Sequence, residues 1–525
     1  MRRLLTVLAA GVPLAAAVYL PTASAETRDA PTATCTAPQV KAPAGTKVES
    51  VTADRRPGGT IAGTGVLGGT VTGVPAFCEV TVTLTHPGAD DRATVRTWLP
   101  VSGWNGRFQG LGGAAYLAGD NGVGLGTAVK NGYAAVTTDA GVGDALDTGW
   151  ALNGQGQVNT ALLENFASRS QHEAAVVGKE VVGAVYGSRP AYSYFTGCST
   201  GGRQGYMEAQ RHPDDYDGIL AAAPAVNWDE FEVATLWPQV VMNNEKTHPS
   251  ACEFKAFTDA AVKACDPLDG VTDGLVNDPA RCDFDPRTLI GTKVVCEGKE
   301  LTITAADAAV VRKIWDGPRT PSGKKLWYGV PIGADISALA GVGPFPVPAA
   351  WVKLWVAKDP SLDLSTITYS RFTQLFKQSQ AEYDKVIGTD DPDLSGFRRS
   401  GGKLLTWQGL ADQYIPAQGT VRYREQVERE MGGTKRVDDF YRLFLAPGTD
   451  HCGLNGGDGS TDGLAALTAW VEHGKAPRTL PATLINASGQ SVTRDLCTYP
   501  QVSRYRGHGD PSLASSFRCV SPSRH

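Results

Sequence analysis

Short apolar runs alternate with longer amphipathic stretches over much of the chain. The apolar runs have the length of buried strands, and they fall at residues 93–100, 134–138, 191–197, 218–223, 403–409 and 440–447. The stretches between them have the spacing and length of helices, and they fall at residues 163–185, 203–212, 418–431 and 461–473. Strands that alternate with helices predict a mostly parallel sheet covered on both faces, so the predicted fold class is α/β.

Two regions depart from this rhythm. Residues 48–85 are rich in Gly, Val and Thr with partial alternation, which predicts antiparallel strands. Residues 227–396 contain several tryptophans among prolines, four cysteines and acidic loops, which indicates a large inserted lid. We therefore expect one α/β domain built from two parts, residues 26–226 and 397–525, with the lid domain 227–396 between them.

The first residues have the pattern of a secretory signal peptide. A basic start, Arg2-Arg3, precedes an apolar run at residues 4–20 and the small-residue site Ala23-Ser24-Ala25. A membrane anchor is the alternative, but the run contains a glycine and a proline and is at the short end of the roughly 17–25 residues that span a bilayer. We expect residues 1–25 to be removed and the mature protein to be secreted, without a membrane anchor.

Charge and cysteine content narrow the function further. With 49 basic and 54 acidic residues the formal net charge is -5, and no basic stripe is present to hold nucleic acid. All ten cysteines follow the signal peptide, and their even number predicts five disulfides in an oxidising compartment. The chain has no Cys-x-x-Cys, so a structural zinc site is not expected.

One G-x-S-x-G pentapeptide, Gly197-Cys198-Ser199-Thr200-Gly201, lies between a predicted strand and a predicted helix. In a nucleophile elbow the chain turns sharply from strand to helix and exposes a serine hydroxyl. The backbone N–H of Thr200, at the start of the helix, would then face a developing oxyanion. A glycine-rich turn without chemistry is the alternative, and the flanking strand and helix favour Ser199 as a nucleophile.

A serine nucleophile needs a general base and a group that orients the base. His451 follows the last of the predicted strands by a short loop, at the carboxyl end where α/β folds place their sites, and the other histidines lack this context. Asp412 follows the preceding predicted strand, so the order Ser199, Asp412, His451 is that of an α/β-hydrolase. A turn or N-cap role is the alternative for Asp412. Asp450 is a weaker candidate for orienting the base because adjacent side chains rarely meet in the required geometry.

Cysteines flank both candidate residues, because Cys198 directly precedes Ser199 and Cys452 directly follows His451. In this pattern the sequence resembles the tannase and feruloyl esterase family, which also includes the enzyme that hydrolyses monohydroxyethyl terephthalate. The resemblance implies an α/β-hydrolase fold and a disulfide between Cys198 and Cys452 across the active site. Such a bridge holds two Cα atoms about 5.5–6 Å apart, so it would tether Ser199 and His451 within reach of each other. The alternative is that either cysteine pairs elsewhere.

Other stretches extend the resemblance over most of the mature chain, at residues 104–108, 110–113, 165–167 and 388–394. In the family the glycine-rich loop supplies the second oxyanion donor, which implies the N–H of Gly112, or less favourably that of Gly113. Relatives often carry a histidine where this chain has Val142, which leaves the substrate contacts of that loop open. The remaining disulfides that the resemblance implies are Cys35–Cys78, Cys265–Cys282 and Cys497–Cys519, and Cys252–Cys296 follows only by elimination.

Residues 265–278 contain four aspartates and two glycines. Carboxylates at this density repel one another unless a hard cation lies among them, and glycines let a loop wrap around such an ion. The resemblance implies a structural calcium ion that stabilises the lid and takes no part in the chemistry. Its ligands would be the side chains of Asp266, Asp269 and Asp273 and the carbonyls of Val271 and Leu275. The pattern is not an EF-hand, and a solvated acidic loop is the alternative.

These observations predict a secreted serine esterase. The reaction would be hydrolysis of carboxylic esters of aromatic acids, of feruloyl, galloyl or terephthaloyl type, through a Ser-His-Asp triad and an acyl-enzyme. No organic cofactor and no nucleic-acid partner are expected. One alternative is a serine peptidase or general lipase on the same fold, and another is a catalytically inactive calcium-binding extracellular protein. The natural ester and the oligomeric state stay open at this point.

Overall fold

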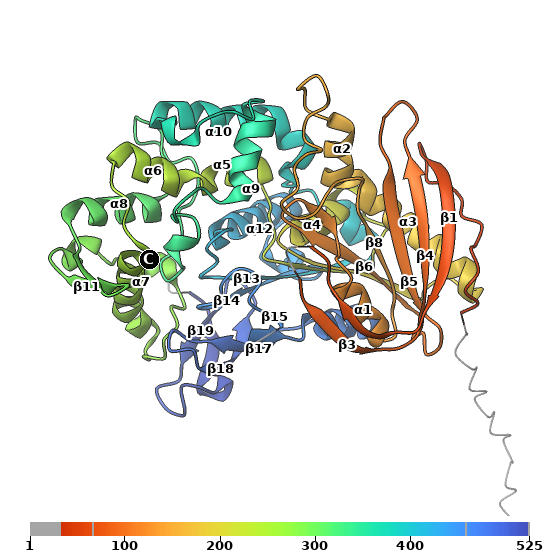
Figure 1. Cartoon of the computed structure of the whole chain (residues 1–525). Coiled ribbons are helices and arrows are strands. Elements are labelled where there is room, and N and C mark those ends of the chain that lie inside the picture. The colour runs from red at the N-terminus through yellow and green to blue at the C-terminus, as the bar shows by residue number, and fades with distance from the viewer. Residues whose placement is uncertain (1–32, 66–67, 457–458, 523–525) are drawn as a thin grey trace, which may run out of the picture.

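The computed structural model describes residues 33–65, 68–456 and 459–522, so the predicted signal peptide lies outside the described residues (Figure 1). A mixed sheet of ten strands forms the centre, in the order β1-β4-β5-β8-β6-β9-β10-β13-β14, with β7 paired to β6. The strands β1, β4, β5 and β8 pair antiparallel, and the pairings from β8 to β14 are parallel. The bounds of these strands are β1 Lys47–Arg56, β4 Phe77–Thr85, β5 Ala93–Pro100, β6 Arg107–Ala114, β7 Leu117–Gly119, β8 Ala134–Thr138, β9 Tyr192–Cys198, β10 Gly218–Ala222, β13 Lys403–Gly409 and β14 Tyr441–Ala446.

Helices cover both faces of this sheet, which confirms the α/β class. One face packs against α3, α4 and α12, and the other against α1 and α14. Consecutive strand residues point to opposite faces, so Leu404 lies in the first of these cores and Leu405 in the second. Both are fully buried, and each such burial stabilises the fold by about 1.5–3 kcal/mol. The bounds of these helices are α1 Val123–Lys130, α3 Ser170–Tyr186, α4 Thr200–Arg211, α12 Ala417–Met431 and α14 Gly463–His473.

Between β10 and β13 the chain leaves the sheet and forms a mainly helical insertion, on the opposite side of the molecule from β1 in Figure 1. Its elements are α5 Trp228–Thr235, α6 Trp237–Glu245, α7 Ala251–Cys265, the hairpin β11 Lys293–Cys296 and β12 Lys299–Thr302, α8 Ala305–Asp316, α9 Pro346–Ala350, α10 Tyr369–Tyr383 and α11 Ser395–Arg399.

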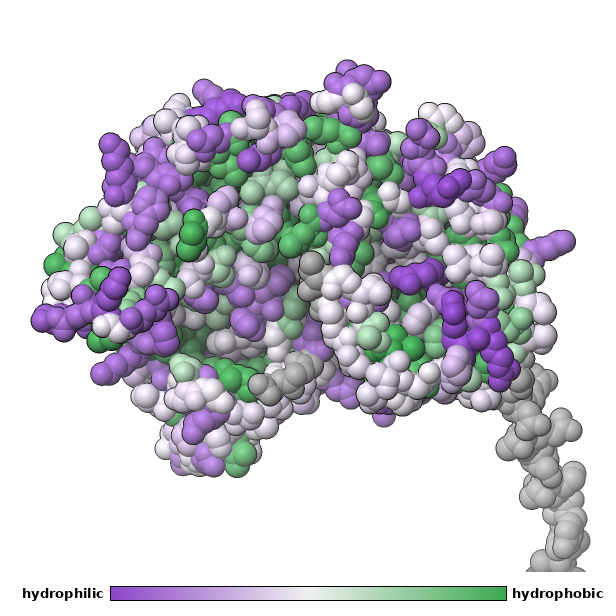
Figure 2. Space-filling model, viewed as in Figure 1, coloured by the Kyte–Doolittle hydropathy of each residue, from purple (hydrophilic) through white to green (hydrophobic). Residues whose placement is uncertain are grey.

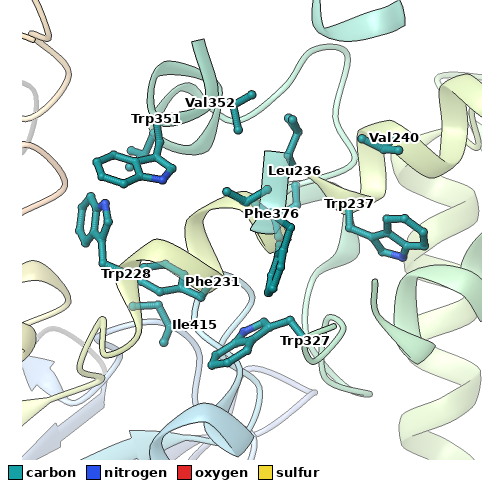
Figure 3. Packing of buried hydrophobic residues seen from close by; sticks show 14 of the residues in the cluster. Trp228, Phe231, Leu236, Trp237, Val240, Trp327, Trp351, Val352, Phe376 and Ile415 are labelled. Carbon is teal, nitrogen blue, oxygen red and sulfur yellow. The ribbon is translucent and has the colours of Figure 1, made fainter. Parts of the chain in front are cut away.

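Aromatic side chains hold this insertion onto the sheet domain. Trp228, Trp351 and Trp355 are buried in a core that also contains Tyr116 from the sheet side. The rings of Tyr116 and Trp355 stack with centroids 5.1 Å apart. Figure 3 shows Trp228, Phe231 and Trp351 close together in this core. Most of the tryptophans that mark the lid in the sequence are thus packing residues, each burying about 150–250 Å² of ring surface.

The structure corrects two expectations. The predicted helix at residues 163–185 is broken, because α2 Thr160–Glu164 is followed by a π-helical turn at Asn165–Arg169 before α3 begins. Inside that turn the Asn165 amide donates to Asp91 and to the Ala140 carbonyl, contacts that a regular helix would not provide. The glycine-rich residues 110–113 lie in strand β6 and are not a loop. The first part of the chain, by contrast, forms the antiparallel strands that its composition predicted.

Smaller strand pairs accompany the main sheet. The pair β2 and β3 lies within the region predicted to be antiparallel, whereas the short, half-exposed strands near the carboxyl end were not apparent from the apolar pattern. They are β2 Gly59–Ala62 with β3 Thr70–Val74, the sheet of β15 Asn455–Gly456, β16 Gly459–Thr461, β17 Thr479–Ile485 and β18 Ser491–Cys497, and the pair β19 Val502–Tyr505 with β20 Phe517–Val520.

Five disulfides join the chain, and they match the expected pairs: Cys35–Cys78, Cys198–Cys452, Cys252–Cys296, Cys265–Cys282 and Cys497–Cys519.

Within the described residues no helix has both the length and the apolar character needed to cross a bilayer. On the face shown in Figure 2, hydrophilic side chains spread over the insertion and the sheet domain alike, with hydrophobic ones scattered between them. Scattered exposed apolar residues are ordinary for a protein surface.

Candidate active site

Ser199 occupies a sharp turn between the end of β9 at Cys198 and the start of α4 at Thr200. Its backbone has φ 63° and ψ -122°, a conformation that costs a non-glycine residue about 1–3 kcal/mol. Three backbone bonds hold it there. The Ser199 N–H donates to the Ala222 carbonyl at 3.1 Å, and the Ser199 carbonyl accepts from the N–H groups of Arg203 at 3.0 Å and Ala225 at 3.1 Å. This is the geometry of a nucleophile elbow, in which the side chain projects from the tip of the turn.

The glycines around the serine are required by close backbone contacts. A Cβ atom on Gly197 would lie 2.5 Å from the carbonyl carbon of Gly201, so any side chain there would push the strand off the helix. Gly112 is equally restricted, because its Cβ would lie 2.5 Å from the Gly201 Cα. The G-x-S-x-G pattern is thus explained by packing of the start of α4 against β9 and β6.

Asp412 and His451 meet in the structure. The Asp412 Oδ2 lies 2.9 Å from the His451 Nδ1. The carboxylate is fully buried, and its other oxygen accepts from the N–H groups of Tyr414 and Ile415 at 3.0 and 2.8 Å. Gln408 Nε2 also donates to Oδ2, at 2.9 Å. Four donors therefore fix the orientation of the carboxylate and, through it, that of the imidazole.

The electrostatics of His451 suit a general base. Burial lowers the pKa of the imidazole, but the charge and hydrogen bond of Asp412, with a further contribution from the Asp450 charge, raise the pKa above its ordinary value. The His451 Nδ1 donates to the Asp412 carboxylate, whereas Asp450 contributes charge and no hydrogen bond. The ring edge of Tyr414 packs against the imidazole with centroids 5.4 Å apart.

The disulfide between Cys198 and Cys452 joins the serine segment to the histidine segment, with 6.1 Å between the two Cα atoms. Ser199 and His451 both line one cavity of about 520 Å³. The bridge spans 254 residues of sequence, so it connects two segments that the chain otherwise links only through the whole insertion. The structure thus brings together all three residues that the sequence singled out for acyl transfer.

The structure restricts the choice of oxyanion donors. The Gly113 N–H donates to Gln204 Oε1 at 2.9 Å and is therefore already used. Gly112 and Thr200 both line the cavity, and the close packing of Gly112 on Gly201 brings the two segments together. The N–H of Thr200 belongs to the first turn of α4, where backbone donors have no partner within the helix.

Gln204 is a positioning residue that sequence reasoning missed. Its side chain is fully buried, accepts from Gly113 and donates to the Ala118 carbonyl at 2.8 Å, so it joins α4 to the β6–β7 hairpin. In the sequence it is marked only by its position five residues after the serine, and a glutamine at that position does not by itself indicate a role. Val142, the departure from the family pattern, packs against the core of the insertion and is not among the described residues that line the cavity.

The acidic loop carries the donor set of a hard cation. Asp266 is buried, and burial raises the pKa of Asp269 and raises that of Asp273 to about 6, with the neighbouring carboxylates adding to each shift. Arg494 pairs with Asp273 and supplies one positive charge against three carboxyl groups. The residues therefore fit a divalent ion in charge and in ligand type.

The loop is held by internal bonds. Asp266 accepts from the N–H groups of Asp273 and Gly274 at 3.1 and 2.8 Å, and Asn277 donates to Asp269. Among the described residues the aspartates of this loop do not form a group whose ligand atoms all lie within 4.8 Å of one another. Coordination of an ion by all of them would therefore require side chains to turn from their present partners.

In the described part of the chain, His172, His212 and Asp215 form a tighter cluster, with ligand atoms within 4.8 Å of one another. The two rings stack with centroids 3.9 Å apart and an angle of 11° between their planes. A metal lies in the plane of each imidazole that binds it, and two nearly parallel stacked planes share no such point nearby. His172 Nδ1 instead bonds Asp215 at 2.6 Å, which raises the pKa of His172, whereas burial lowers that of His212 to about 4.

A mixed sheet flanked by helices, with a serine at a strand-to-helix turn and an aspartate and a histidine after later strands, defines an α/β-hydrolase. The family described as "Tannase and feruloyl esterase" matches residues 78–520, so the chain belongs to that family. It is therefore an enzyme of the carboxylic ester hydrolase class, as the sequence predicted.

Individual relatives agree with this assignment. A protein of Arthroderma benhamiae described as "Probable feruloyl esterase" is 49% identical over 462 residues, which cover 85% of this chain and 86% of that protein. "Tannase" of Aspergillus oryzae is 30% identical over 513 residues, with 85% of each chain covered. The solved structure "Tannin acyl hydrolase from Aspergillus niger" matches with a TM-score of 0.80 at 26% identity, covering 92% of this chain and 93% of that one.

Proposed function

We propose that the protein is a secreted serine esterase that hydrolyses esters of aromatic acids through a Ser199–His451–Asp412 triad. One observation carries the proposal: a serine in an elbow and a histidine bonded to a buried aspartate line the same cavity and are tethered by a disulfide. Buried polar arrangements of this kind are costly, so they are characteristic of catalytic sites.

In the first step, His451 Nε2 takes the proton from Ser199 Oγ as that oxygen bonds to the ester carbonyl carbon. The carbonyl electron pair moves to oxygen, and the N–H groups of Thr200 and Gly112 stabilise the oxyanion. Asp412 stabilises the imidazolium that has formed at His451. Each N–H donor to the oxyanion is worth about 2.7–4 kcal/mol in the transition state.

In the second step, the tetrahedral intermediate collapses, the ester C–O bond breaks, and His451 gives its proton to the leaving alcohol. The acyl group stays on Ser199 Oγ. A water then enters, His451 removes one of its protons, and attack on the acyl carbon releases the carboxylic acid and restores the serine.

Aromatic acyl groups are the substrate class that the relatives and the cavity favour. Two named relatives are a feruloyl esterase and a tannase. The cavity lining combines aromatic side chains, among them Trp228 and Phe231, with other apolar residues and with polar ones. A peptidase or general lipase would use the same triad. Turnover of small aromatic esters in preference to peptides and long acyl chains distinguishes the proposed activity from both.

We also propose that calcium binds at the acidic loop through the side chains of Asp266, Asp269 and Asp273 and the carbonyls of Val271 and Leu275. When bound, the ion neutralises the excess negative charge of the loop and stabilises the fold there. Secretion is proposed as well, and the N-terminal pattern and the five disulfides support it.

The test is an ester panel of methyl ferulate, methyl gallate, a terephthalate monoester and nitrophenyl acetate, with the wild-type protein and Ser199→Ala. We expect turnover of at least one aromatic ester by the wild type and loss of that turnover in the variant. A serine-directed phosphonate should label Ser199 in the wild type. Failure with every ester, or equal turnover by the variant, would overturn the proposal, and absence of labelling would favour an inactive binding protein.

A further inference from the structure

Helix α5 presents one face to the cavity. Four of its residues line the cavity, Trp228, Phe231, Glu232 and Thr235, and their spacing of three, four and seven places them on the same side of a helix. Figure 3 shows Trp228 and Phe231 close to Ile415, which also lines the cavity. This side of the cavity is therefore an apolar, aromatic surface with one carboxyl group on it.

The Glu232 carboxyl is buried and has no partner. The residue is 4% exposed, and its carboxyl makes no hydrogen bond or ion pair with any residue that the structure describes. Glu230, on another side of the same helix, instead pairs with Gln380 at 2.7 Å and with Arg422 at 3.1 Å. A polar group without a protein partner is bonded by water or by a ligand, and the place of Glu232 on the cavity wall opens its carboxyl to a ligand.

Burial also sets the charge state of this group. Burial raises the pKa of Glu232 well above its usual range and therefore favours the uncharged carboxylic acid. In that state it offers one O–H donor and one carbonyl acceptor. A nearby phenol, Tyr116, is itself buried, and its hydroxyl is already used in a 2.9 Å bond to the Val347 carbonyl. Glu232 is thus left free to bond to a ligand.

The cavity wall lacks a cation. Among the described residues that line it there is no lysine and no arginine, and the side chains with acidic or basic groups are Asp120, Glu232 and His451. An acyl group that carries a carboxylate would lose its water in the cavity without a positive partner, which is costly. A neutral hydroxyl on an aromatic ring has no such cost and forms a hydrogen bond with a carboxylic acid.

We propose that Glu232 is a specificity-determining residue that hydrogen-bonds a phenolic hydroxyl of the acyl group while Trp228 and Phe231 contact its ring. The enzyme therefore favours esters of hydroxylated aromatic acids over esters of unsubstituted or carboxylate-bearing ones. This inference rests on the proposed esterase function and assigns its acyl subsite. A site built to bond a hydroxyl rejects the analogue that lacks it, because its own polar group is then left unpaired.

The first test needs no variant. The methyl esters of cinnamic, 3-hydroxycinnamic, 4-hydroxycinnamic and 4-carboxycinnamic acid are compared by kcat/KM with the wild-type enzyme. We expect at least one hydroxylated ester to exceed the unsubstituted ester by about tenfold or more, and the carboxylated ester to be the poorest. Equal kcat/KM for the hydroxylated and unsubstituted esters, or preference for the carboxylated one, would overturn the proposal.

Two variants then assign the effect to this side chain. Glu232→Gln keeps a donor and an acceptor and should keep the preference for the hydroxyl. Glu232→Leu removes both, and its ratio of kcat/KM for hydroxylated over unsubstituted ester should fall to near one while the unsubstituted ester is still hydrolysed. Glu230→Gln is the matched control on the same helix, outside the cavity, and should leave the ratio unchanged.

The failure of each idea has its own signature. If the wild type hydrolyses no ester, the esterase function itself fails. If Glu232→Leu hydrolyses esters with the wild-type ratio, the subsite assignment fails and the esterase function stands. Should Glu232→Leu fold poorly, the ratio measured with Glu232→Gln decides, together with binding of 4-hydroxycinnamate and cinnamate esters to Ser199→Ala by calorimetry. Equal affinity of Ser199→Ala for the two esters would overturn the assignment.

Discussion

Replacing Asp412 by asparagine tests the proposed mechanism at the point where the structure is most specific. The two carboxylate oxygens accept four hydrogen bonds, from Tyr414 N–H and Ile415 N–H on one side and from Gln408 Nε2 and His451 Nδ1 on the other. An asparagine has one oxygen and one NH2 group. The oxygen must face the two backbone donors, because those N–H groups cannot reverse.

The NH2 group then faces Gln408 and His451. It can donate to His451 only if Nδ1 carries no hydrogen, so the proton of the neutral ring moves to Nε2, which then cannot take a proton from Ser199. The expected loss in kcat is about 10⁴-fold, which corresponds to about 5 kcal/mol of transition-state stabilisation. The NH2 group also opposes the Gln408 donor, which should lower the free energy of unfolding by about 1–3 kcal/mol.

The assay compares initial rates on nitrophenyl acetate and the rate of phosphonate labelling of Ser199 in the wild type and in Asp412→Asn. Thermal unfolding shows whether the variant is folded at the assay temperature. Asp450→Asn is the matched control, because it removes a neighbouring carboxylate that contributes charge and no bond to the imidazole. Activity of Asp412→Asn within tenfold of the wild type would refute the assigned role of the aspartate.

Three further predictions follow from the same contacts. The double variant Cys198→Ala/Cys452→Ala should lose activity, because the bridge tethers the two reacting segments. It should also lose about 4 kcal/mol of stability, because the bridge closes a long loop. Full activity and an unchanged Tm would show that the bridge is dispensable. The value of kcat/KM should fall on the acid side of the pH profile as His451 becomes protonated, because only the neutral imidazole accepts a proton and its pKa is raised. Asp450→Asn removes a charge that raises this pKa, so it should move the acid limb to lower pH. A shift of the limb to higher pH would contradict the assigned effect of Asp450. Removal of calcium with a chelator should lower Tm, and calcium should restore it better than magnesium, whereas a Tm insensitive to the chelator would exclude a resident ion at residues 265–278.

The local chemistry of the candidate site could be predicted from the sequence because it depends on short-range constraints. The elbow needs glycines where β9, β6 and α4 touch, and the pentapeptide around Ser199 contains glycines at Gly197 and Gly201 for this reason. Strand and helix periodicity gave the α/β class for the same reason, since one face of each element must be apolar. The two cysteines beside Ser199 and His451 linked segments that no periodicity could relate.

Long-range contacts supplied the rest. Burial and the absence of a partner make Glu232 a candidate for ligand binding, and both depend on how α5 docks against residues far away in the chain. The same holds for Gln204, whose side chain accepts a hydrogen bond from the Gly113 N–H, far away in the chain. The sequence does not distinguish a polar residue that lies in water from one that lines a cavity. Only packing settles its solvation, and solvation sets both its charge and its freedom to bind.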